Sequence, residues 1–359
     1  MGRRGWLHRS GRAEHGTRAW LLILLVAAPA ACTDKTDADY RSDVDVAVHA
    51  SIGQRIADLL QATRDLQAAS PSRAWRANSS DAPAITAMRN AWKRTRLAYE
   101  QVEGALKAVF PSLDAAMDAR YEEALAHLAG AGDKNLFDGR GVTGMHAIER
   151  ILFAPVTRRE VIAYERTLDG YQPASYPATD DEAIAFKTGL VQRLIDDSDS
   201  LRKQWQMSAV DLTAAYRGQV GMMIEQQDKV NMAVTGEEES RYANITLADL
   251  RNNLDGTQQI YDLFGEWIHS KAAGAPSDSK IRTRFGELAT VYATTASDAL
   301  PAVPSGWSAD QPTPENLATP FGVMWLTVHE SVDPDNEGSV VFELNQIAAL
   351  LGLPGPADP

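Results

Sequence analysis

The fold class is decided by residues 44–68, VDVAVHASIGQRIADLLQATRDLQA, because their apolar side chains recur at the spacing of one helix face. The residues expected on that face are Val46, Ile52, Ile56, Leu59 and Leu60. The same period continues along the chain, and the period-2 alternation typical of strands is almost absent. The sequence therefore predicts an all-α protein.

Proline, glycine and loop signals divide the rest of the chain into further helices. The expected helices are residues 83–109, 111–128, 144–153, 181–206, 209–234, 246–270, 279–299, 313–329 and 339–351. The loop at residues 168–179 marks the expected boundary between two lobes. Long helices joined by short loops predict two adjoining bundles of about four helices each, over residues 43–165 and 180–352.

The first 31 residues have the composition of a signal peptide. Five arginines and one glutamate precede an apolar run at 21–31, which is shorter than the roughly 20 residues that span a bilayer. The run ends at Ala30-Ala31-Cys32, which resembles a bacterial lipobox, although Pro29 replaces the usual aliphatic residue. We therefore expect cleavage before a lipidated Cys32, with 32–42 as a polar linker. Cleavage after a small-x-small triplet without lipid is the alternative.

Charge and cysteine content limit the partners. Removal of residues 1–31 changes the formal net charge from −13 to −17, and such a surface repels nucleic acid and attracts cations. Cys32 is the only cysteine, so the mature chain forms no internal disulfide. We expect the periplasm or outer membrane of a bacterium, with membrane contact through the lipid and no nucleic-acid partner.

The most specific motif is GMHAIE at residues 144–149. On a helix, His146 and Glu149 are three residues apart and share one face. An imidazole and a carboxylate placed in this way can reach the same metal ion, as the Glu-x-x-His pairs of di-iron bundles do in reversed order. A His–Glu hydrogen-bonded pair at the surface is the alternative.

Trp92, Arg96, Tyr99 and Glu103 form a stripe at i, i+4, i+7 and i+11 that mixes charged and aromatic residues. A purely structural stripe would be apolar, and a buried charge needs a partner because its desolvation is costly. Arg96 and Glu103 therefore neutralise their surroundings or line a polar site. The alternative places the aromatic residues in the core and the charges at solvated edges.

Two acidic segments complete the candidate groups. Asp114 and Asp118 share a helix face, and the helix dipole favours an acid at the first turn but does not explain Asp118. A loop at residues 235–242 contains three successive glutamates and precedes a helix with further polar residues. Successive glutamates are otherwise solvated charge.

In their order and spacing, these four segments resemble the imelysin-like family, which includes EfeO-type periplasmic iron-uptake proteins. The resemblance covers about residues 43–264. It implies a pair of helical bundles with a polar metal site. The metal ligands that it implies by position are Glu103, Asp118, His146, Glu149 and Glu238, with Arg96, Tyr99, Arg120 and Tyr242 beside them.

The chain departs from the family pattern at two places. One extra residue within 237–240 leaves Glu237 as an alternative to Glu238. Thr246 stands where an aspartate is common, which leaves a fifth acidic ligand without support.

One imidazole and several carboxylates form a hard ligand set, suited to ferric or ferrous iron and also to zinc or another divalent metal. We therefore expect an envelope-anchored binding protein, rather than an enzyme, that captures iron and passes it to a permease or another envelope protein. One alternative is an imelysin-type metallopeptidase, although the chain lacks His-Glu-x-x-His. The other is a structural envelope lipoprotein with a decayed site.

Overall fold

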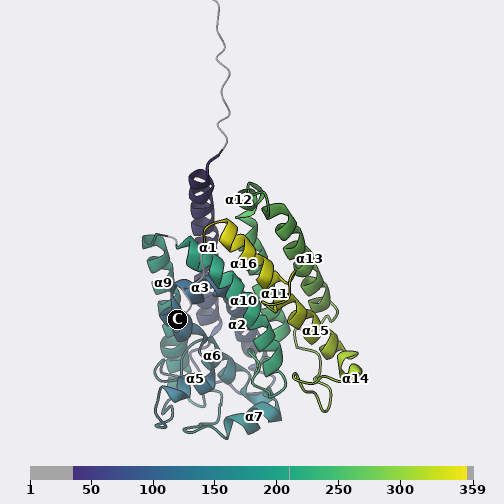
Figure 1. The fold of residues 1–359 in the computed structure, drawn as a ribbon. Coiled ribbons are helices and arrows are strands. Elements are labelled where there is room, and N and C mark those ends of the chain that lie inside the picture. Colours follow the sequence, from purple (N-terminus) through teal and green to yellow (C-terminus); the bar gives the residue numbers. More distant parts are fainter. Residues whose placement is uncertain (1–34, 210, 354–359) are drawn as a thin grey trace, which may run out of the picture. The chain divides into compact units, whose positions relative to one another are not determined.

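Helices form all the regular secondary structure that the computed structural model describes, which covers residues 35–209 and 211–353 (Figure 1). The all-α prediction is thus confirmed. The expected signal segment and Cys32 lie outside the described residues. Within those residues, no helix combines the length and the hydropathy that a membrane crossing requires.

The first helix, α1 (Asp37–Ala69), packs along α2 (Ala82–Glu100) and α9 (Val191–Met207). Its buried face includes four of the five expected residues, but Val46 is 68% exposed. The face instead begins with Val44 and Val48, which continue the four-residue spacing back from Ile52.

Two of the expected helices are interrupted near the candidate site. The segment 83–109 divides into α2 and α3 (Glu103–Val109), and the segment 111–128 divides into α4 (Pro111–Asp118) and α5 (Tyr121–Ala126). The second break occurs because Arg120 is extended and caps α5, with its backbone N–H donating to the Glu123 carboxylate at 2.9 Å. Both breaks place an acid, Glu103 or Asp118, at a helix end.

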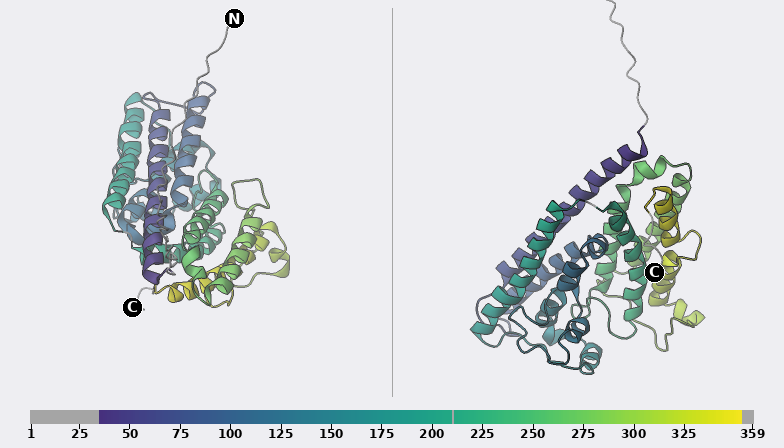
Figure 2. Two further views of the ribbon diagram at one scale, coloured as in Figure 1. Left: turned by 90° about the horizontal axis from the view of Figure 1, so that it is seen from above. Right: turned by 60° about the vertical axis from the view of Figure 1, so that its left-hand side comes forward.

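The later helices follow the predicted order with shorter lengths and small additions. They are α6 (Met145–Leu152), η1 (Ala154–Val156), α7 (Arg159–Glu165), α8 (Asp180–Ala185), η2 (Phe186–Leu190), α10 (Leu212–Met232), α11 (Thr246–Asp262), α12 (Gly265–His269), α13 (Gly274–Tyr292), α14 (Pro314–Leu317), α15 (Pro320–Val332) and α16 (Val340–Leu350). In both views of Figure 2, the yellow and light-green helices gather on one side of α10 and the purple and blue helices on the other.

Helix α10 connects these two groups, because it contacts α3 as well as α11, α15 and α16. Helix α13 in turn packs on α15 and α16. Helix α9, expected in the second bundle, lies along α1 of the first. The division into bundles over residues 43–165 and 180–352 stays a prediction.

The close approach of α10 to α3 depends on two glycines. A Cβ added at Gly218 would lie 1.9 Å from the backbone oxygen of Gly104, and one added at Gly104 would lie 2.9 Å from the backbone oxygen of Gly218. Both distances are shorter than a van der Waals contact. An alanine at either position must therefore push the two helices apart.

We predict that Gly218→Ala lowers the free energy of unfolding by about 1–3 kcal/mol, the usual cost of overpacking. Gly221→Ala is the matched control on the same helix, because its Cβ would meet nothing within 4 Å. An exposed helical alanine should leave stability unchanged or raise it by up to about 1 kcal/mol. Urea unfolding of both variants measures the difference, and equal effects would contradict the packing argument.

Candidate metal centre

The position of His146 follows from the glycine that begins its motif. Gly144 has φ +91°, and a Cβ there would lie 2.6 Å from the backbone oxygen of Met117. Only glycine combines this dihedral with so close an approach. The N-terminus of α6 therefore lies directly against the end of α4, which carries Asp118.

Three side chains from distant segments meet at this point. The Nε2 atom of His146 lies 3.4 Å from Oδ1 of Asp118 and 3.3 Å from Oε1 of Glu239. One ligand atom from each residue lies within 4.8 Å of the other two. Metal–oxygen and metal–nitrogen bonds are about 2.0–2.2 Å long, so small side-chain adjustments would bring all three atoms to one ion. We call Asp118, His146 and Glu239 the triad.

Glu149 holds the other side of the His146 ring. Its Oε2 lies 2.9 Å from Nδ1 of His146, and its Oε1 accepts hydrogen bonds from the backbone N–H groups of Tyr242 and Ala243 at 3.0 and 2.8 Å. A carboxylate on one imidazole nitrogen orients the ring and leaves the other nitrogen for a metal. The contacts of Glu149 thus fix the direction of Nε2 and attach the loop at 233–245 to α6.

Arg96 contacts two members of the triad from α2. Its guanidinium pairs with Oδ1 of Asp118 and lies 2.9 Å from Oε1 of Glu239. It also pairs with Glu100, and its Nε lies 3.7 Å from Asp249. The arginine is fully buried, so these ion pairs lie in a medium of low dielectric constant.

A second buried cation, Lys229 of α10, neutralises acids next to this group. Its Nζ lies 3.0 Å from Glu103 and 3.2 Å from Glu100, and it donates to Asn253 at 3.1 Å. The Asn253 amide also donates to Glu103 at 3.0 Å. Burial raises the pKa of Glu103, but the charges of Lys229 and Arg96 outweigh this effect and lower that pKa to about 2. In this structure Glu103 is therefore a partner of Lys229.

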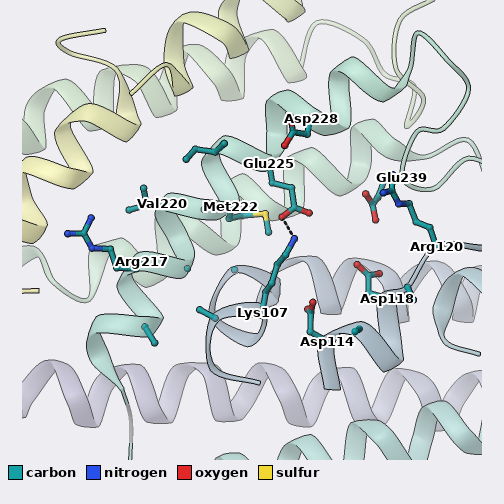
Figure 3. Close-up of a pocket in the computed structure, with 18 of the residues that line it drawn as sticks. Lys107, Asp114, Asp118, Arg120, Arg217, Val220, Met222, Glu225, Asp228 and Glu239 are labelled. Atoms are coloured by element: carbon teal, nitrogen blue, oxygen red, sulfur yellow. Dashed lines mark hydrogen bonds and ion pairs between the residues drawn. The ribbon is translucent and has the colours of Figure 1, made fainter. Parts of the chain in front are cut away.

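Asp118 and Glu239 of the triad line one end of a cleft of about 1610 Å³ between α3, α4 and α5 on one side and α10 on the other. Figure 3 shows Asp118 and Glu239 at this end, next to Arg120, with the Lys107–Glu225 pair in the middle and Arg217 at the far end. Two of the three triad side chains, Asp118 and Glu239, therefore face this cleft, whereas His146 is buried behind them. The cleft connects an otherwise buried group of charges with the surface.

Two acids of the cleft wall and the histidine of the triad have strongly shifted pKa values. Burial, with the nearby Asp118 charge, raises the pKa of Asp114 to about 7, and burial also raises that of Glu225 to about 7. Burial lowers the pKa of His146, but hydrogen bonds to three carboxylates outweigh it and hold the pKa well above its usual value. These directions indicate a negative potential that favours protons or other cations.

The structure brings some of the expected site residues together and places others apart. His146 and Asp118 meet, Glu149 adjoins them, and Glu103 lies in the neighbouring Lys229 cluster. Glu238 does not join them, because its carboxylate pairs with Arg158. Glu237, the alternative, instead lies near Tyr164.

Of the residues expected beside the ligands, some contact the triad and others do not. Arg96 contacts the triad directly, whereas Tyr99 donates to Asp114 and Tyr242 donates its hydroxyl to Glu165. Arg120 pairs with Glu123 at the cleft rim. Two residues of this group, Glu239 and Lys229, were not predicted from the sequence. The only sequence signal for Glu239 is the run of three glutamates, and that run does not show which of the three lies next to His146.

Comparison with known proteins agrees with the resemblance seen in the sequence. The iron uptake system component EfeM of Pseudomonas syringae pv. syringae (strain B728a) is 25% identical over 201 residues, which are 55% of this chain. This chain thus spans 56% of the length of that relative. The family model described as Imelysin (peptidase M75) matches residues 52–313. Since that match spans most of the chain and includes the whole triad, the chain belongs to the imelysin family.

Proposed function

We propose that this protein binds an iron ion through Asp118, His146 and Glu239 and takes part in iron uptake at the cell envelope. The observation that carries the proposal is the convergence of an imidazole nitrogen and two carboxylate oxygens within 4.8 Å at the end of a cleft. The name of the 25% identical relative, an iron uptake component, supports iron as the cargo.

The chemistry of the donor set fits this cargo. Two hard oxygen donors and one imidazole suit iron in either oxidation state, and the triad contains no thiolate that would favour a softer metal. Three protein ligands on one side leave coordination positions facing the cleft. An ion bound there remains accessible to a permease or another envelope protein that receives it.

This proposal gives two of the expected ligands other roles. Glu149 orients the His146 ring through Nδ1, and Glu103 keeps Lys229 in place. Glu239 takes the position that the family resemblance implied for Glu238, or alternatively for Glu237. Acidic side chains outnumber basic ones on the cleft wall, which would attract the incoming cation over about a Debye length.

We predict that Glu239→Gln weakens iron(II) binding roughly tenfold or more, because it removes one charged oxygen ligand. Anaerobic calorimetric titration measures the affinity. Glu238→Gln is the matched control in the same loop, since Glu238 pairs with Arg158 outside the triad, and its affinity should equal that of the wild type. Weakening by Glu238→Gln alone would show that the assigned register of the loop is wrong.

The affinity should also rise with pH. His146 has a raised pKa in the folded protein, so it carries a proton at neutral pH that a metal on Nε2 must displace. Below that pKa, each fall of one pH unit should therefore weaken binding by up to about tenfold for the one proton released. Titrations at pH 6, 7 and 8, in buffers of different ionisation enthalpy, measure this release. A wild type that binds equally well at all three values would contradict the role of His146.

We also propose that the protein is exported and anchored by a lipid on Cys32. In cells of a lipoprotein-processing bacterium, Cys32→Ser should move the protein from the membrane fraction to the soluble fraction, because the substitution removes the proposed lipid anchor and no helix within residues 35–209 and 211–353 could cross a membrane. Immunoblots of the two fractions measure the change. An unchanged distribution would favour another means of attachment or plain cleavage.

A further inference from the structure

The oxygens that a metal would take are already shared with a resident cation. Oδ1 of Asp118 and Oε1 of Glu239 each contact both Nε2 of His146 and the guanidinium of Arg96. A metal bonded to these oxygens would lie close to a buried positive charge. Repulsion at such short range is strong in a medium of low dielectric constant. Metal binding therefore requires Arg96 to break or lengthen at least one of its contacts with these two oxygens.

A second buried acid, Asp249, lies close to Arg96, so the guanidinium can change partners and stay inside the protein. The carboxylate of Asp249 is fully buried on the first turn of α11, and beyond the nearby Ser240 hydroxyl neither of its oxygens has a hydrogen-bond partner. It faces Nε of Arg96 at 3.7 Å, and this Nε also has no hydrogen-bond partner. A small shift would close this contact. Glu100, which already pairs with Arg96, would hold the arginine during the change.

On these contacts, which rest on the proposed metal site, we propose that Arg96 is an exchangeable counter-ion of the triad. Without metal, it neutralises Asp118 and Glu239 and keeps them in place. When a metal ion binds, the guanidinium moves its contacts to Asp249 and Glu100. When the ion leaves, Arg96 returns to the two oxygens and completes the release. The arginine thus limits affinity and favours transfer of the ion to the next protein.

Removal of the competing charge should tighten metal binding. We predict that Arg96→Gln binds manganese(II), a hard and redox-stable probe, about tenfold more tightly than the wild type, with slower dissociation. Titration followed by electron paramagnetic resonance measures affinity, and stopped-flow mixing with a chelator measures dissociation. If Arg96 instead only positions the ligands, the same variant binds more weakly, which overturns the proposal.

Asp249 provides a second test that keeps the arginine. Asp249→Asn removes the acid to which Arg96 moves, so it should weaken manganese(II) binding several-fold although Asp249 belongs to no proposed ligand set. In the Arg96→Gln background, the same substitution should have little effect, because its action passes through the arginine. An equal effect in both backgrounds would indicate a direct charge effect and would overturn the exchange.

Asp278→Asn is the matched control, since Asp278 is a buried acid with its own partners, Tyr261, His269 and Arg282. It should leave manganese(II) affinity unchanged.

The outcomes can be distinguished even if circular dichroism shows that Arg96→Gln does not fold. In that case Asp249→Asn alone tests the exchange, and an unchanged affinity of this variant would count against it. A wild type that binds neither manganese(II) nor iron(II) contradicts the proposed function itself. A wild type that binds metal while Arg96→Gln binds no tighter contradicts only the counter-ion.

Discussion

The structure depends on a buried cluster of charged side chains in which carboxylates outnumber cations. Arg96 and Lys229, both fully buried, lie among these acids together with the buried imidazole of His146. The effective penalty for burying an unpaired ion is several kcal/mol, so the excess negative charge must attract protons or a metal ion. The acids in this group are Glu100, Glu103, Asp118, Glu149, Glu239 and Asp249.

Three of these acids lie at or near the ends of helices that meet in the fold. Asp118 ends α4, Glu103 begins α3, and Asp249 lies in the first turn of α11. The positive φ of Gly144 places α6 against the end of α4, and the paired glycines of α3 and α10 bring Lys229 close to Glu103. The same helices form the walls of the cleft, so the excess charge is accessible from the surface.

The fold class and half of the centre could be predicted from local patterns. A helical period is repeated in every segment, and the spacing of His146 and Glu149 on one short helix is visible in the sequence. The breaks at 101–102 and 119–120 were not predicted, because the apolar period continues across them. Glu239 was missed because nothing in a run of three glutamates fixes the register of an irregular loop. The pairing of Glu103 with Lys229 joins residues 126 positions apart, and no local pattern reports it.

Anomalous X-ray diffraction from crystals of the metal-loaded protein, recorded on both sides of the iron absorption edge, would locate the bound iron. We expect one anomalous peak at bonding distance, about 2.0–2.2 Å, from Nε2 of His146 and from carboxylate oxygens of Asp118 and Glu239. A peak at another group of residues, or an empty triad in a protein that has bound iron, would contradict this expectation.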